Sequence, residues 1–153
     1  MDGIVARMIH VLAVLFWIGG VAFVTLVAMP SVRARHDPAE RLAAFHALED
    51  RFAAQARLWV LLAGASGLWM VWRGAMWDRF RDPHFWWMHA MVALWALFAA
   101  MLFVIEPLVL RRRLAASTDP ARDFARMERM HRLLLAAAVV TVAGAVAGSH
   151  GFY

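Results

Sequence analysis

Two histidines lie inside long apolar stretches of this sequence and are its best-placed candidates for chemistry. His10 sits near the start of the first apolar stretch, and His89 near the start of the third. An ionisable side chain inside an apolar span is costly, usually faces neighbouring helices and is a functional candidate by default. The structural alternative is a neutral imidazole that is hydrogen-bonded to an adjacent helix.

The composition is that of a chain in contact with lipid. The sequence is 63% hydrophobic and 18% charged, whereas soluble domains average about 45–50% apolar and about 25% charged residues. Cysteine and lysine are both absent, which excludes disulfides, thiolate metal sites and lysine Schiff bases. The arginines alternate with apolar runs, so membrane topology explains the basic charge and no nucleic-acid partner is expected.

Four stretches approach the roughly 20 apolar residues that cross a bilayer. We expect spans at about residues 4–29, 55–73, 85–110 and 131–150, within one transmembrane domain covering residues 1–153. The predicted fold class is therefore all-α, an integral membrane four-helix bundle of up-down topology.

The arginines indicate how this bundle is oriented. Five lie in the first connection, Pro30–Arg57, and seven in the third, Arg111–Arg132. The middle connection, Arg73–Pro83, has three, which are offset by two aspartates. The positive-inside rule then puts the first and third connections in the cytoplasm and both termini outside. We expect a multi-pass protein of the bacterial inner membrane.

A weak internal repeat relates the two halves of the chain. Each half has a histidine near a helix start, a tryptophan about two turns later, a proline, an Asp-Pro-Ala segment and a glycine-containing helix. The markers are His10, Trp17, Pro30, Asp37-Pro38-Ala39, Gly64 and Gly67 in the first half, and His89, Trp95, Pro107, Asp119-Pro120-Ala121, Gly144 and Gly148 in the second. Such a pattern predicts two helical hairpins related by a pseudo-two-fold axis.

This repeat places His10 and His89 at one depth on the first and third helices. In a square bundle with neighbours about 10 Å apart, these helices are diagonal and roughly 14 Å apart. Zinc or copper needs several donors at about 2 Å from one centre, whereas haem iron needs only two axial ligands from the protein. The sequence therefore predicts His10 and His89 as the metal ligands of a b-type haem.

Other residues could complete such a cofactor site. Small residues on the second and fourth helices would make room for a macrocycle, although close helix packing needs the same residues. Cations and histidines near the outer face could contact the propionates, with anchoring to lipid headgroups as their alternative role. The candidates are Gly67, Gly144, Gly148, Arg7, Arg73, Arg81, His84 and His150.

Two segments resemble a known membrane family. The pattern His10-x6-Trp17-x-Gly19-Gly20, followed by Pro30, resembles the first helix of the CopD-like copper-resistance domain. The HemJ-like protoporphyrinogen oxidases share its His-x6-Trp part. The segment from Arg51-Phe52 to Gly67-Leu68 is similar to the second helix of that group. The resemblance covers most of the chain, through short motifs.

One departure from this group affects the expected activity. The resemblance implies b-type haem, and in HemJ-like proteins the activity is associated with the helix-one histidine and a lysine at about the position of His89. Here that lysine is replaced by histidine, and a Pro-Arg segment after the tryptophan is absent. The change favours a bis-histidine cytochrome that passes single electrons between a quinol or membrane partner and an outer acceptor.

Three alternatives stay open at this stage. The CopD-like resemblance implies copper transport or tolerance, for which Cu(I) would need His10, His89 and a methionine such as Met88 or Met91. The HemJ-like resemblance implies a haem-dependent membrane oxidoreductase acting on protoporphyrinogen. The third is a non-catalytic subunit of a respiratory membrane complex.

Overall fold

The structure is a computed structural model that describes residues 1–110 and 116–151. The side chains of residues 50, 51, 109 and 110 are outside that description. Arg111, Arg112 and Arg113, which contribute to the predicted cytoplasmic charge, also lie outside the described residues.

All regular structure in the described residues is helical, which confirms the predicted all-α class. Segments η1 and η4 are π-helical, and η2 and η3 are 3₁₀-helical. The elements in chain order are α1 (Asp2–Phe23), η1 (Val24–Ala28), α2 (Met29–Arg35), α3 (Arg41–Arg73), η2 (Met76–Arg81), η3 (Pro83–Phe85), α4 (Trp86–Ala100), η4 (Met101–Leu110) and α6 (Pro120–Ser149).

Three helical stretches are long and apolar enough to cross a membrane. They are Asp2–Arg35, Pro83–Leu108 and Pro120–Ser149. Helix α3 has 33 residues and is about 50 Å long at 1.5 Å per residue, but its first half is rich in charged residues. The three apolar stretches make this a multi-pass membrane protein, and the crossing by α3 stays a prediction.

Large apolar side chains on the outside of these helices support the same conclusion. Leu15 on α1 is 62% exposed, and Val140 on α6 is 61% exposed. Soluble monomers rarely expose wide apolar patches, because water makes them sites of association. A bilayer is the environment that covers such a surface without a protein partner.

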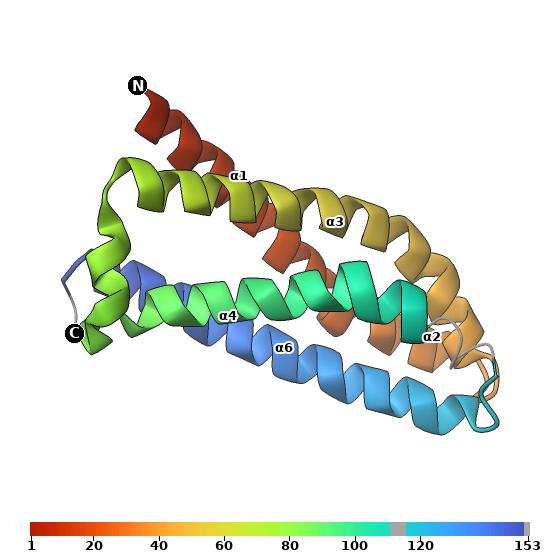
Figure 1. The fold of residues 1–153 in the computed structure, drawn as a ribbon. Coiled ribbons are helices and arrows are strands. Elements are labelled where there is room, and N and C mark those ends of the chain that lie inside the picture. The colour runs from red at the N-terminus through yellow and green to blue at the C-terminus, as the bar shows by residue number, and fades with distance from the viewer. Residues whose placement is uncertain (111–115, 152–153) are drawn as a thin grey trace.

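The long helices run side by side along the molecule (Figure 1). Helix α1 packs against α3, and α4 packs against α6. The start of α1, the end of α6 and the η2–η3 connection lie toward one end, called here the termini end (Figure 1). The opposite end carries α2 and the starts of α3 and α6, and is called here the arginine end after Arg33, Arg35, Arg41 and Arg122. Which end faces the cytoplasm stays a prediction.

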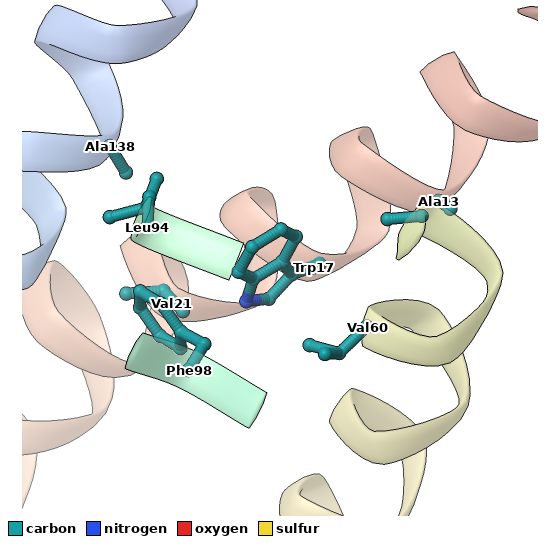
Figure 2. Close-up of a cluster of buried hydrophobic side chains, with 8 residues drawn as sticks. Ala13, Trp17, Val21, Val60, Leu94, Phe98 and Ala138 are labelled. Atoms are coloured by element: carbon teal, nitrogen blue, oxygen red, sulfur yellow. The ribbon is translucent and has the colours of Figure 1, made fainter. Parts of the chain in front are cut away.

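Buried side chains from all the long helices meet in the middle of the molecule (Figure 2). This central core consists of Ala13, Trp17, Val21, Val60, Ala63, Leu94, Phe98 and Ala138. A second cluster lies toward the arginine end, around Met29, Phe45 and Phe124. Helix α6 begins at Pro120, where the Asp119 side chain accepts a hydrogen bond from the Arg122 N–H at 3.0 Å. An Asp N-cap followed by Pro at the first helical position is a typical helix start.

Both halves of the predicted repeat contain a π-helical segment close to proline. Pro107 lies inside η4, and η1 ends two residues before Pro30. A proline removes a backbone donor and crowds the preceding turn, and a widened π turn is one way in which a helix accommodates such a disruption. The repeat therefore has a local structural counterpart at the prolines.

Candidate functional site

His10 joins α1 to α3 near the termini end. Its Nδ1 donates a hydrogen bond to the carbonyl oxygen of Ala63 at 2.9 Å, and lies 3.2 Å from the Ser66 hydroxyl oxygen. The Ser66 hydroxyl in turn donates to the Leu62 carbonyl, so its oxygen is free to accept from the imidazole. These bonds fix the orientation of the ring.

The bond to Ala63 also decides which nitrogen of His10 can bind a ligand. A carbonyl oxygen only accepts, so the proton sits on Nδ1, and in the neutral ring Nε2 carries the free lone pair. Nε2 has no hydrogen-bond partner among the described residues. Metal-bound histidines commonly have this arrangement, with the other ring N–H held by a backbone carbonyl.

His89 is engaged differently, at the start of α4. Its Nε2 donates to the carbonyl oxygen of Phe80 at 3.0 Å, and its Nδ1 lies 3.4 Å from the Phe85 carbonyl oxygen. The ring also packs edge-on against Phe80, with centroids 5.5 Å apart. His89 is exposed and fastens the η2 segment to α4. In this conformation both of its nitrogens face carbonyl oxygens.

The three glycines expected to make room for a macrocycle lie against aromatic rings. A Cβ built on Gly67 would lie 3.2 Å from Cε1 of His10. On Gly144 it would lie 2.4 Å from the Trp86 ring, and on Gly148 2.5 Å from the Trp87 ring. These glycines therefore let rings approach the backbone of α3 and α6 closely. Space for a macrocycle at Gly144 and Gly148 would require the two indoles to move.

The predicted propionate contacts have partners of their own at the termini end. Arg73 lies 3.7 Å from the Asp2 carboxylate, and Arg81 lies 3.1 Å from Asp78. His150 ends α6, where its Nδ1 donates to the Val146 carbonyl oxygen at 2.8 Å. Arg7 is exposed on α1. Among the predicted site residues, the structure brings His10 and Gly67 together.

His84 forms a compact turn with Asp82. The Asp82 carboxylate accepts hydrogen bonds from the His84 backbone N–H and ring Nδ1, both at 2.9 Å. The backbone bond, followed by the side-chain bond, holds the pKa of Asp82 below its ordinary value, because both stabilise the charged carboxylate. This turn starts η3 and so sets the direction in which α4 begins.

No protein-family model, no curated protein and no solved structure matches this chain. The CopD-like and HemJ-like resemblance therefore stays a prediction from short motifs.

The sequence reasoning missed one polar cluster at the arginine end. Glu128 on α6 is 2% exposed, and its carboxylate is hydrogen-bonded to Arg33 on α2 and to Arg132 on its own helix. The spacing of Glu128 and Arg132, four residues apart, is typical of a helical ion pair and was the available signal. The partner from α2 could not be foreseen, because it lies 95 residues away in sequence. The cluster ties α2 to α6.

Proposed function

We propose that this multi-pass membrane protein holds a b-type haem near its termini end, with His10 as one axial ligand. The observation that carries the proposal is the state of the His10 ring. Its Nδ1–H is held by the Ala63 carbonyl, which leaves Nε2 as a lone-pair donor inside an apolar span. Haem iron takes up such a nitrogen, and the carbonyl bond raises its basicity as a ligand.

His89 is proposed as the second axial ligand, and it can bind iron only if its present hydrogen bond breaks. Its Nε2 is hydrogen-bonded to the Phe80 carbonyl in the structure described. Binding iron through that nitrogen requires this bond to break and η2 to shift, and Trp86 and Trp87 would have to leave Gly144 and Gly148. His10 thus presents a ligand nitrogen without rearrangement, whereas His89 and the two indoles would have to rearrange.

A bound haem would supply a one-electron Fe(III)/Fe(II) couple. Two histidine ligands leave no open position on the iron, which suits electron transfer between a quinol or membrane partner and an acceptor at the outer face better than substrate binding at the metal. The residues of the chain would hold the iron, exclude water from it and set its potential through burial. On the positive-inside reading, the termini end faces the outside of a bacterial inner membrane.

The decisive experiment is the visible spectrum of the purified chain, oxidised and after dithionite reduction. We expect a Soret band that shifts on reduction, and its loss or change in His10→Ala. His36→Ala is the matched control, since His36 is exposed at the opposite end and its ring has no described partner. A chain that takes up no haem when haem is supplied would overturn the proposal.

The variant His89→Ala separates the alternatives that the sequence leaves open. A change from a six-coordinate low-spin to a high-spin spectrum supports His89 as the second ligand. An unchanged haem spectrum would mean that His89 is not a ligand and that the iron is held by His10 and another group. Oxidation of added protoporphyrinogen would then test the HemJ-like alternative. Bound copper without haem would favour the CopD-like alternative. Co-purification with a larger complex, without a chromophore, would favour a non-catalytic subunit.

A further inference from the structure

Two arginines from different helices bind one buried carboxylate at the arginine end, where α2 and the start of α6 lie (Figure 1). Arg33 on α2 and Arg132 on α6 each donate from Nη2 to a different carboxylate oxygen of Glu128. The Glu128 side chain is 3% exposed, whereas both arginine side chains are at least half exposed. The two guanidinium groups of this Arg33–Glu128–Arg132 triad are therefore fixed from inside the molecule and open to the outside.

The charges of this triad do not balance. Two guanidinium groups share one carboxylate, which leaves one net positive charge, and no other acidic side chain among the described residues contacts Arg33 or Arg132. Their hydrogen bonds to Glu128 engage only Nη2 of each side chain. A guanidinium group also carries N–H donors on Nε and Nη1. The triad therefore has both a positive charge and hydrogen-bond donors left for an anion.

Both arginines lie at the end of an uncharged run of the chain. Residues 11–32 precede Arg33 and residues 133–149 follow Arg132, and neither run contains a charged residue. Each run belongs to a helical stretch that is apolar enough to cross a membrane. Because Glu128 binds both arginines, their guanidinium groups lie at one level. At this level the hydrocarbon core of a bilayer is expected to meet the phosphate groups of its lipids.

Exposed apolar side chains continue from these arginines along the outside of the helices. Val139 on α6 is exposed and lies seven residues after Arg132, on the same helix face. Leu26 on η1 is exposed and lies about two turns before Arg33. Segment η1 packs against α6, so the two apolar surfaces are neighbours. Together they offer acyl chains a surface that ends at the two guanidinium groups.

The chemistry of the triad favours a lipid phosphate with a net negative headgroup. The planar guanidinium fork matches the oxygens of a phosphate, which every phospholipid carries at the border of a bilayer. Arg129, one turn before Arg132, is exposed and has no partner among the described residues. This further positive charge repels the ammonium group of a zwitterionic headgroup. An anionic phospholipid therefore fits the site better than a zwitterionic one.

We propose that the Arg33–Glu128–Arg132 triad binds the phosphate of an anionic phospholipid, whose acyl chains lie along the exposed surface of η1 and α6. The Glu128 carboxylate holds both guanidinium groups in place, so little side-chain entropy is lost when the phosphate binds. The phosphate then neutralises the remaining positive charge of the triad. This site lies at the opposite end of the molecule from His10 and does not depend on the haem proposal.

The test is native mass spectrometry of the full chain in detergent, with phosphatidylglycerol and phosphatidylcholine of identical acyl chains added in equal amounts. One arginine near an anionic surface favours binding by about fivefold, so we expect the wild-type chain to retain about five times more phosphatidylglycerol. Equal retention of the two lipids would overturn the proposal without any variant. Inorganic phosphate in excess should not displace the bound lipid, because it has no acyl chains. Displacement would assign the triad to a soluble phosphate and overturn the lipid site.

A triple variant, Arg33→Gln with Glu128→Gln and Arg132→Gln, removes the triad without leaving a buried charge unpaired. It lowers the net charge by one unit, and so does the control Arg122→Gln, which changes an exposed arginine ten residues before Arg132 on the same helix. We expect the triple variant to lose the preference for phosphatidylglycerol and the control to keep it. An equal loss in both would show non-specific attraction by charge and overturn the proposal.

A second variant covers the case in which the triple variant does not fold. Ala136 is exposed on α6, one turn after Arg132 on the same face, so Ala136→Glu needs no repacking. Its carboxylate would bind Arg132 from outside and compete with the lipid phosphate, again lowering the net charge by one unit. We expect Ala136→Glu to lose the preference for phosphatidylglycerol that Arg122→Gln keeps. Equal preferences in these two variants would contradict the site.

Discussion

Nδ1 of His10 lies 2.9 Å from the carbonyl oxygen of Ala63, across the contact between α1 and α3. This one bond leaves Nε2 as the lone-pair nitrogen of the neutral ring, and it holds the imidazole against Gly67. Ring orientation and access to a metal therefore depend on the fit between two helices that are far apart in sequence. The same dependence makes the contact testable by small changes on α3.

The first prediction concerns Gly67, against which His10 packs. A Cβ there would lie 3.2 Å from Cε1 and 3.4 Å from Nδ1 of His10, so Gly67→Ala should push the imidazole away from the Ala63 carbonyl. If His10 binds haem, the Soret band should shift or weaken, which spectra of the purified variant would measure. Gly19→Ala is the control, because nothing lies within 4 Å of its added Cβ. Identical spectra for the two variants would contradict the role of this contact.

A second prediction concerns the packing of α4 against α6. Added methyl groups on Gly144 and Gly148 would overlap the rings of Trp86 and Trp87 respectively. Overpacking of this kind costs about 1–3 kcal/mol. Trp86 is 48% exposed and can swing aside, whereas Trp87 is 6% exposed and is confined. Gly148→Ala should therefore lower the free energy of unfolding in detergent more than Gly144→Ala does. The reverse order would contradict the confinement of Trp87.

The third prediction concerns the buried carboxylate of Glu128. Its side chain is 3% exposed, while those of Arg33 and Arg132 are 50% and 63% exposed. Arg33→Ala or Arg132→Ala alone leaves one cation on the carboxylate. The double variant leaves the buried Glu128 carboxylate without either arginine, which costs about 3–5 kcal/mol. In denaturant unfolding, the double variant should lose more free energy of unfolding than the two single variants together. A loss equal to the sum of the two single losses would contradict the shared site.

The fourth prediction concerns pH and the Asp82–His84 turn. The pKa of Asp82 is lowered by the His84 backbone N–H, so the turn stabilises the fold above the ordinary carboxyl pKa. This contribution is lost as the pH falls through the lowered value. Asp82→Asn should therefore make the backbone order at the start of α4 less dependent on acidic pH. Hydrogen exchange of the His84 amide, measured as a function of pH, would report this order. An unchanged pH dependence in Asp82→Asn would assign the effect to another group.

Much of the local structure follows from the sequence alone. The apolar runs predict helices, and Asp119-Pro120 predicts the start of α6 at the residue where it begins. The equivalent segment of the first half, Asp37-Pro38-Ala39, gives a less sharp start: the Asp37 carbonyl accepts hydrogen bonds from the N–H groups of Glu40 and Arg41, and regular helix begins at Arg41. These features are short-range, since caps and prolines act within one turn.

The arginine pattern and the apolar spans likewise determine that this is a membrane protein, because the cost of burying charge in lipid is a property of each segment by itself. What the sequence could not decide is the partner of each polar side chain. The acceptor for His10 lies 53 residues away, and Trp95 donates to the Val60 carbonyl 35 residues away. Such partners are chosen by how the helices pack. The tertiary structure alone therefore decides that one histidine keeps a free lone pair and the other faces two carbonyl oxygens. It also decides that the indole N–H of Trp17 is buried without a hydrogen-bond partner among the described residues.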